Sequence, residues 1–371
     1  MSLVVVAPDS FKGTASAATA AAAIARGWVS VRPHDEIILL PMADGGEGTL
    51  AAFAAAVPGA IAVPVNVTGP DGRSVSSEWL LLPDDTGVVE LASTSGLTLM
   101  DELAVFDANS VGFGQAIVAA LDAGVRRLVL GIGGSASTDG GAGVLSALGA
   151  RLLDANDALV PPGNRGLGAL AGVDLGALRA MPAEGAIVLT DVRNPLLGAD
   201  GAAAVFGEQK GATPGDIPAL EANLARLASL LGGNAMAPGT GAAGGVGFGL
   251  HTWGAVLRPG AEAVGELLGL PIAIAAASLV ITGEGRFDAQ SAGGKVPAWV
   301  NAQAAAVGTA TALVAGSIAT DPSSFSTGSF NYALSLGKLA GDVDAAIADP
   351  VRWLEAAGVA LALDVTAENA L

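Results

Sequence analysis

Short apolar runs that end in polar, glycine-flanked residues recur along this chain. The first two are "SLVVVAPDS" at 2–10 and "DEIILLPMADGG" at 35–46, and each precedes an alanine-rich segment. A short, continuous apolar run is typical of a strand that is buried on both faces. Strands that alternate with helical segments favour a parallel sheet with helices on both faces. The pattern therefore predicts an α/β protein.

Residues 61–91 follow a different pattern, in which apolar and polar residues alternate between turn signals at 69–72 and 84–87. This alternation predicts antiparallel hairpins. We therefore expect two domains. The first is discontinuous, comprises residues 1–66 and 278–371, and has a flavodoxin- or Rossmann-like parallel sheet. The second is an inserted α/β domain with antiparallel hairpins, at residues 67–277.

Five predicted strands end in polar, glycine-flanked loops, at 9–13, 44–48, 133–141, 191–194 and 283–288. In open α/β sheets, ligands bind beyond the carboxyl ends of the strands. A single loop of this kind is usually only a turn, because Asp and Gly are common turn residues. Five such loops together indicate a ligand site.

The loop "GIGGSASTDGGAG" at 131–143 is the richest in glycine. Glycine lets backbone approach a phosphate closely, and the following helix N-terminus favours an anion. The pattern predicts that Gly133, Gly134 and Ser135 hold phosphate, although the loop taken alone favours a tight turn. Asp139 suits either a magnesium shell or a helix cap.

Phosphoryl transfer needs a phosphate cradle, a group of cations with magnesium, and a group that orients or deprotonates the nucleophile. Acids that could contact magnesium, mostly through water, are Asp44, Glu47, Asp139, Asp191, Glu284 and Asp288. Cations that could balance phosphate or a substrate carboxylate are Lys12, Arg193, Arg286 and Lys295. A Walker loop is absent around "SAGGKV" at 291–296, because Ala289 stands where the first glycine should be and Val296 follows Lys295 in place of Ser or Thr. Nor does a G-x-G-x-x-G motif open the first strand–helix unit.

Composition removes several other classes of function. The formal net charge is −18 and the 17 Lys and Arg form no cluster, which disfavours nucleic-acid binding. Two His and no Cys exclude a His-rich metal site and thiolate chemistry. The sequence shows no membrane span and no targeting signal, so we expect a cytoplasmic protein; it makes no prediction of oligomeric state.

Seven motifs occur in the order expected of the bacterial glycerate kinase family of the galactarate/glyoxylate-pathway type. They are "APDSFKG", "LPMADGGEGT", "GIGGSASTDGGAG", "TDVRNPLLG", "VFGEQKGA", "GAAGGVGFGL" and "TGEGRFDAQSAGGK". The chain resembles this family from about residue 5 to about residue 316. The resemblance implies phosphorylation of D-glycerate by ATP with Mg²⁺, most often giving 2-phosphoglycerate. It also implies a two-domain α/β protein with the active site in the cleft between the domains.

On this resemblance we assign hypothetical roles. Lys12 holds the glycerate carboxylate or the transferring phosphoryl group, and Asp191 orients or deprotonates the attacking hydroxyl. Asp44 and Asp139 position magnesium. Predicted substrate-binding residues are Asp9, Ser10, Asn194, Arg193 and Arg286, and predicted ATP-binding residues are Gly133, Gly134, Ser135 and Lys295. Thr138 departs from the family, which usually has Asn at this position.

Three alternatives stay open at this point. The product could be 3-phosphoglycerate, or the acceptor could be another small hydroxy acid or a sugar. The chain could also be a non-catalytic binding or regulatory protein on the same fold, although a pure binder has no need of Asp44, Asp139 and Asp191 together.

Overall fold

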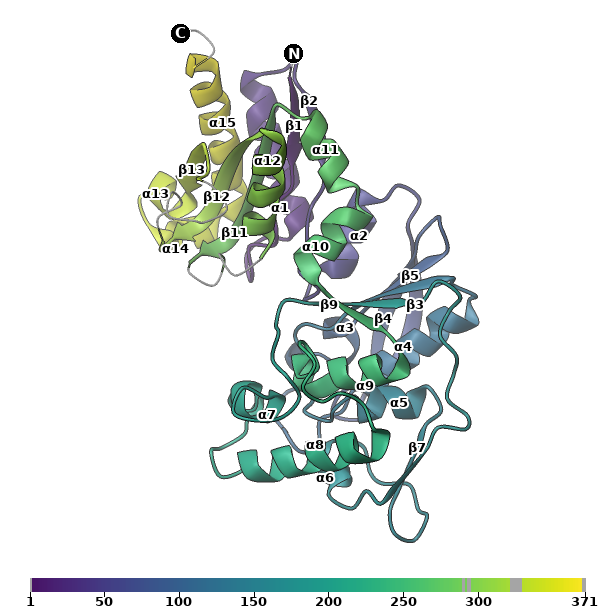
Figure 1. Cartoon of the computed structure of the whole chain (residues 1–371). Helices are drawn as coiled ribbons and strands as arrows, with labels where there is room; N and C mark the ends of the chain where they lie inside the picture. Colours follow the sequence, from purple (N-terminus) through teal and green to yellow (C-terminus); the bar gives the residue numbers. More distant parts are fainter. Residues whose placement is uncertain (1, 289–290, 292–294, 321–328, 369–371) are drawn as a thin grey trace. The chain divides into compact units, whose positions relative to one another are not determined.

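The computed structural model describes residues 2–288, 291, 295–320 and 329–368 (Figure 1). The chain divides into two compact units. We call Met1–Asp44, Ala51–Pro58 and Gly260–Leu371 the terminal unit, and Gly45–Leu50 with Gly59–Pro259 the inserted unit. Each unit has its own sheet and its own hydrophobic core.

The terminal unit is built on five parallel strands in the order β13-β12-β11-β1-β2. The strands are β1 Leu3–Val6, β2 Glu36–Leu39, β11 Leu279–Phe287, β12 Ala310–Ile318 and β13 Tyr332–Ser335. Counted along this unit alone, the spatial order is 2-1-3-4-5, which is the flavodoxin order. The chain leaves β1 on one side and returns beside it as β11, so the topological switch point lies between these two strands. The predicted fold class is confirmed.

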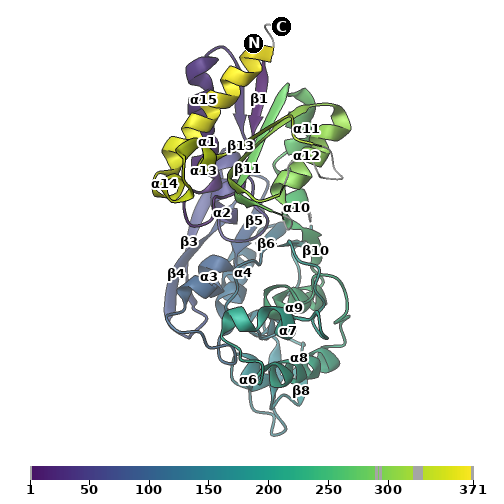
Figure 2. The ribbon, with the colours of Figure 1, turned by 90° about the vertical axis from the view of Figure 1, so that its left-hand side faces the viewer.

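Helices cover both faces of this sheet, with α1 and α15 on one face and α11 and α12 on the other (Figure 2). The helices of the unit are α1 Ala17–Val31, α10 Gly260–Leu267, α11 Leu270–Ala276, α12 Val296–Val307, α13 Leu336–Ala340, α14 Val343–Ala348 and α15 Pro350–Glu368, and α2 Thr49–Ala56 begins in the inserted unit. Helix α1 starts at Ser16, whose hydroxyl accepts from the Thr19 N–H at 3.1 Å. A Cβ on Gly27 would overlap the carbonyl oxygen of Glu355, so glycine allows α1 and α15 to pack backbone against backbone.

The inserted unit has a mixed six-stranded sheet in the order β10-β9-β6-β5-β4-β3. Its strands are β3 Ile61–Thr68, β4 Ser74–Leu81, β5 Thr86–Glu90, β6 Arg127–Gly131, β9 Ala186–Thr190 and β10 Val256–Pro259. Strands β3, β4 and β5 are antiparallel, as the alternating pattern predicts, whereas β5, β6, β9 and β10 run parallel. A small antiparallel pair, β7 Arg151–Leu153 and β8 Gly172–Asp174, completes the unit.

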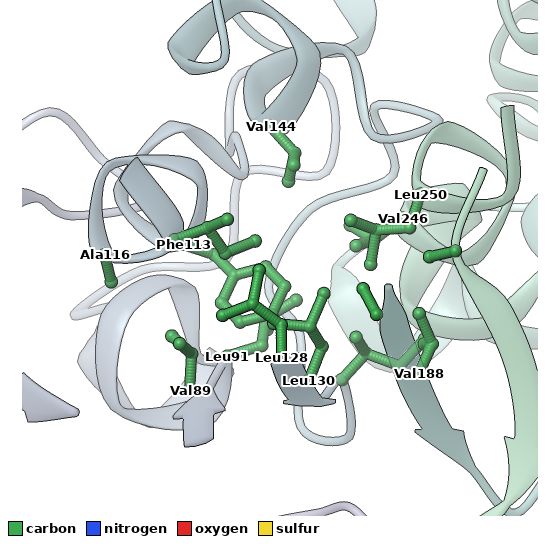
Figure 3. Close-up of a cluster of buried hydrophobic side chains, with 14 of the residues drawn as sticks. Val89, Leu91, Phe113, Ala116, Leu128, Leu130, Val144, Val188, Val246 and Leu250 are labelled. Carbon is green, nitrogen blue, oxygen red and sulfur yellow. The ribbon is translucent and has the colours of Figure 1, made fainter. Parts of the chain in front are cut away.

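The core of the inserted unit lies between this sheet and three helices, α4 Val111–Asp122, α5 Ala142–Ala147 and α9 Val246–Trp253. Figure 3 shows Phe113, Leu130 and Val246 converging in it, and all three are fully buried. Burial of each such side chain contributes about 1.5–3 kcal/mol. The remaining helices are α3 Ala92–Ser95, α6 Asn164–Leu167, α7 Ala202–Phe206 and α8 Ile217–Leu231, with 3₁₀ turns η1 Leu97–Leu99, η2 Glu208–Lys210 and η3 Ala242–Gly245.

The unit boundaries differ from those expected from the sequence. Residues 260–277 belong to the terminal unit because α10 and α11 pack against α12. Residues 59–66 belong to the inserted unit because β3 pairs with β4 along its whole length. In the part of the chain that the structure covers, no helix combines the length and apolar character needed to cross a bilayer.

Candidate functional site

A pocket of about 400 Å³ lies in the terminal unit at the switch point of its sheet. Asp9 follows β1, Asp44 follows β2, and Glu284 lies on β11. Because the strands are parallel, their carboxyl ends bring these three acids to one edge of the sheet. Three cations, Lys12, Arg286 and Lys295, also line the pocket, with Ser10 and Asp288. We call this the acid pocket.

Asp9 is almost fully buried in the acid pocket, with only 6% of its surface exposed. Its backbone N–H donates to the Gly283 carbonyl at 2.8 Å, which fixes it beside β11. Burial raises its pKa to about 8, with a further upward contribution from the negative charge of Asp44. The Ser10 N–H, at 2.6 Å from Oδ1, and the Lys12 ammonium lower the pKa but do not offset burial. The raised pKa of Asp9 therefore favours its protonated, neutral form.

Glu284 is equally buried, at 6% exposure, and burial raises its pKa too. A hydrogen bond with Ser291 and the charges of Lys295 and Lys12 act in the opposite direction. Its Oε1 atom has no hydrogen-bond partner among the described residues. A buried polar atom left unpaired costs about 1–3 kcal/mol, so this oxygen is suited to a donor that a ligand brings.

The cations of the acid pocket are more exposed than its acids. Lys12 is exposed in the turn that follows β1. Arg286 is 71% exposed along its side chain and pairs with Asp288 at 3.3 Å. Lys295 occupies the N-cap position of α12. The pocket therefore combines buried acids with a positively charged rim, a combination that suits a ligand with both hydroxyl groups and an anionic group.

The predicted phosphate loop follows β6 in the inserted unit. Gly133 donates its N–H to the Gly45 carbonyl at 2.9 Å, and a Cβ on Gly133 would lie 2.5 Å from the Cα of Gly46. Gly134 has a φ of +76°, which a side chain would strain. These glycines therefore serve chain packing and turn geometry, whatever else they hold.

Asp139 is fully buried and accepts five hydrogen bonds. Oδ2 accepts from the Ser110 N–H and hydroxyl and from the Gly143 N–H, and Oδ1 accepts from the Gly141 N–H and the Ser137 hydroxyl. Both oxygens are occupied by donors around the start of α5. This environment does not fit the predicted magnesium role and supports the alternative, a structural cap of that helix.

Magnesium usually keeps several waters and takes one or two carboxylates from the protein. Across residues 2–288, 291, 295–320 and 329–368, no group of three or more His, Cys, Asp or Glu side chains is arranged to hold a metal ion. Asp44, 8% exposed and lining the acid pocket, fits a water-shelled ion better than Asp139 does.

Lys210, which the sequence interpretation did not single out, lies beneath the glycine loop. It is 2% exposed, and its Nζ donates to Ser135 Oγ at 2.7 Å and to the Ser137 carbonyl at 2.5 Å. Burial lowers its pKa to about 7, against the opposing influence of the Asp139 charge. The motif "VFGEQKGA" contains this lysine, but nothing local in that motif shows that it is buried.

The predicted catalytic loop at 191–194 follows β9. Asp191 and Arg193 are exposed, and the Asn194 side-chain N–H donates to the Asp200 carbonyl at 2.8 Å. Because β6 and β9 are parallel neighbours, this loop and the glycine loop leave the same edge of their sheet.

The structure divides the predicted site residues between two places. Asp9, Ser10, Lys12, Asp44, Arg286 and Lys295 line the acid pocket, whereas Gly133, Gly134, Ser135, Asp139, Asp191, Arg193 and Asn194 belong to the inserted unit. An active site between the units stays a prediction.

Comparisons with known proteins agree with this architecture. The sequence model of the glycerate kinase family matches residues 4–365. The chain is 43% identical over 331 residues to a glycerate kinase of Bacillus subtilis, covering 86% of each chain. It is 42% identical over 305 residues to a glycerate 2-kinase of Escherichia coli, covering 79% of this chain and 80% of the relative. A crystal structure of a putative glycerate kinase 2 from Salmonella typhimurium LT2 matches all of both chains with a TM-score of 0.87 at 37% identity. The chain therefore belongs to the glycerate kinase family, and it is an enzyme of the kinase class.

Proposed function

We propose that this enzyme transfers the γ-phosphoryl group of ATP to D-glycerate and releases 2-phospho-D-glycerate. Family membership supports the reaction class, and the name of the Escherichia coli relative supports position 2. The observation that carries the proposal for this chain is the acid pocket. D-glycerate has two hydroxyl groups and one carboxylate, which match its buried acids and its cationic rim.

In the acid pocket, each group has a role that follows from its charge and burial. The neutral Asp9 carboxyl and the unpaired Glu284 Oε1 hydrogen-bond the hydroxyl groups of the substrate. Lys12 binds the carboxylate or the transferring phosphoryl, and Ser10 and Arg286 assist it at the rim. Lys295 binds an ATP phosphate. Magnesium, held by Asp44 mainly through water, would shield the phosphate charges.

The chemical step forms a bond between a glycerate hydroxyl oxygen and the γ-phosphorus of ATP and breaks the bond to the β–γ bridging oxygen. ADP leaves, and the hydroxyl proton goes to a carboxylate. Asp9 is a poor acceptor in the protonated form that its raised pKa favours. We therefore keep Asp191 as the proposed base or orienting group, with Arg193 and Asn194 as substrate contacts and Gly133–Ser135 as the phosphate loop.

The test of the reaction is ADP release by the purified full chain with ATP, Mg²⁺ and D-glycerate. L-glycerate, glycolate and sugars serve as competing acceptors, and phosphorus NMR identifies the product. We expect D-glycerate to be the best acceptor and the phosphate to be on position 2. Absence of glycerate-dependent ADP would overturn the proposal, and phosphate on position 3 would correct the position alone.

The role of Asp191 has its own test. Asp191→Asn should lower kcat about 10²–10⁴-fold while leaving the melting temperature unchanged, because general-base catalysis contributes a factor of that size. Asp200→Asn removes an exposed carboxylate from the same segment and serves as the matched control. Near-full turnover by Asp191→Asn would exclude this residue as the base.

A further inference from the structure

The inserted unit contains a buried positive charge for which the proposed reaction has so far no use. Lys210 ends the short turn η2 and is 2% exposed. Removing an ammonium group from water costs several kcal/mol unless the protein supplies partners. A buried lysine directly under a loop that is predicted to hold phosphate therefore needs an explanation.

The partners of Lys210 supply one. Its Nζ donates to Ser135 Oγ at 2.7 Å and to the Ser137 carbonyl at 2.5 Å. A hydroxyl group has one proton and two lone pairs. When Lys210 carries its positive charge, the Ser135 oxygen accepts from an ammonium group, which has no lone pair, so the Ser135 proton must be donated elsewhere. Ser135 makes no other side-chain hydrogen bond within the residues that the structure describes.

Two backbone groups beside this hydroxyl are also available. In the described part of the chain, neither the Gly134 N–H nor the Ser135 N–H donates to a protein acceptor, whereas the carbonyl of Gly134 accepts from the Leu97 N–H at 2.8 Å. Gly134 is exposed and has a φ of +76°. Successive N–H groups around such a residue are typical of anion-binding backbone. The loop thus offers three neighbouring donors with a positive charge behind them.

The surroundings hold the ammonium group in this place. A Cβ on Gly244 would overlap the Ser137 carbonyl oxygen and would lie 2.8 Å from Lys210 Nζ. The nearby carboxylate of Asp139 already accepts five other hydrogen bonds. A chain with a net charge of −18 repels ATP in general, so a cation fixed under this loop favours phosphate binding there.

We propose that Lys210 is a positioning residue of the glycine loop, which acts by committing the Ser135 hydroxyl as a donor to an ATP phosphate. This inference rests on the proposed role of Gly133–Ser135 and adds the residue that organises it. The phosphate touches Ser135 and the neighbouring N–H groups, and Lys210 acts through Ser135.

The test is a double-mutant cycle on ATP binding. Equilibrium binding of ATP, and separately of inorganic tripolyphosphate, is measured by calorimetry on the full chain without glycerate. Lys210→Met and Ser135→Ala should each weaken ATP binding about 10-fold or more, as expected for a hydrogen bond to a charged group. The double variant should bind no more weakly than the weaker single variant. Lys338→Met, which removes an exposed lysine, is the matched control and should bind like the wild type.

Kinetics separate positioning from a merely structural role. We expect KM for ATP to rise in both variants while KM for D-glycerate stays within about 2-fold. A structural role alone would lower the melting temperature and the active fraction and would leave the ATP affinity of the folded protein unchanged. If Lys210→Met does not fold, Ser135→Ala alone decides, since wild-type ATP affinity in that variant overturns the proposal. Additive effects in the cycle would also overturn it.

These measurements also separate this inference from the proposed function. If the chain binds ATP and tripolyphosphate through Ser135 and Lys210 but releases no ADP with D-glycerate, the role of Lys210 stands and the proposed reaction is wrong. If the chain has full glycerate kinase activity but Lys210→Met and Ser135→Ala bind ATP like the wild type, the proposed reaction stands and the role of Lys210 is wrong.

Discussion

The acid pocket and the region beneath the glycine loop each contain a buried ionisable side chain, Asp9 and Lys210. Burial shifts the pKa values of these two side chains in opposite directions. It raises the pKa of Asp9 to about 8 and lowers the pKa of Lys210 to about 7. Both groups therefore titrate near neutral pH, from starting values of 3.8 and 10.5. Desolvation disfavours whichever form is charged, so one physical cause produces a neutral acid in one unit and an easily deprotonated base in the other.

The carboxylates of the two regions differ more sharply. Asp139, beside the glycine loop, has both oxygens occupied by five donors, whereas Glu284, in the acid pocket, has one oxygen with no partner in the described residues. Burial alone does not distinguish them, since both lie below 10% exposure. The two carboxylates differ in whether their oxygen atoms already accept hydrogen bonds, and an unpaired oxygen such as Glu284 Oε1 is available to a donor.

The largest effect should come from Asp139→Ala. The substitution leaves the Ser110 side chain and several N–H groups around α5 buried without an acceptor. We expect the free energy of unfolding to fall by about 3–5 kcal/mol, measured by urea denaturation. A loss below about 1 kcal/mol would show that the five hydrogen bonds contribute little and would remove the contrast with Glu284.

Glu284→Gln should behave in the opposite way. The variant keeps the shape of the side chain and cannot leave a charge unpaired, so we expect the free energy of unfolding to stay within about 1 kcal/mol of the wild type. The turnover with D-glycerate should fall about 10- to 100-fold, because the amide presents a different donor to the substrate hydroxyl. Glu78→Gln, an exposed site on β4, controls for charge. Unchanged kinetics would mean that Oε1 does not meet the substrate.

A smaller effect is expected at the rim of the acid pocket. Lys12→Ala should raise KM for D-glycerate about 10-fold, or lower kcat by a similar factor if the lysine contacts the transferring phosphoryl instead. Stability should not change, because Lys12 is exposed. Steady-state kinetics in both substrates decide between the two roles, with Lys338→Ala as the control. If neither KM nor kcat changes, Lys12 has no part in the reaction.

The smallest expected effect is the change in the free energy of unfolding per pH unit, which tests the opposite pKa shifts of Asp9 and Lys210. Asp9 binds its proton more tightly in the folded state, so its stabilising contribution is complete below pH 3.8 and is lost as the pH rises to about 8. Lys210 binds its proton less tightly in the folded state, so its contribution to stability rises between about pH 7 and pH 10.5. Each slope is at most about 1.4 kcal/mol per pH unit.

The measurement is denaturant unfolding over a pH series. Asp9→Asn should flatten the decline in stability between pH 5 and 8, and Lys210→Met should flatten the rise above pH 7. If both variants kept the pH profile of the wild type, the opposite pKa shifts of Asp9 and Lys210 would be contradicted.

The sequence pattern predicted the sheets because strand burial is a local property. Alternating residues gave the hairpin of β3 and β4, and continuous apolar runs gave parallel strands such as β1 and β11. The boundary near residue 259 was missed because the alanine-rich helices α10 and α11 could pack on either unit. Their contacts with α12 are set by the tertiary structure.

The sequence indicated which side chains lie together where they are close in the chain and follow one strand, as Asp9, Ser10 and Lys12 do. Contacts between residues that are far apart in the sequence could not be predicted. Lys210 lies 75 positions from Ser135, and Ser110 lies 29 positions from Asp139. Residue type alone cannot tell a helix cap from a metal ligand, because the distinction depends on which donors the fold brings to the carboxylate.

The pairing of β1 with β11 determines when the protein can fold during its synthesis. Val4 can pair with Leu279 only after β11 has been synthesised. Helix α1 can pack against α15 only when α15 is complete, because Gly358 of α15 contacts Ile24 of α1. At roughly 5–20 residues per second, the ribosome needs on the order of tens of seconds to supply β11 after β1 has been made. The inserted unit has all its strands by Pro259 and so completes its sheet first. The first strand of the chain can thus pair with β2 early but gains its second neighbour, β11, late. A nascent chain that stalls before α15 exposes the apolar face of α1 to aggregation.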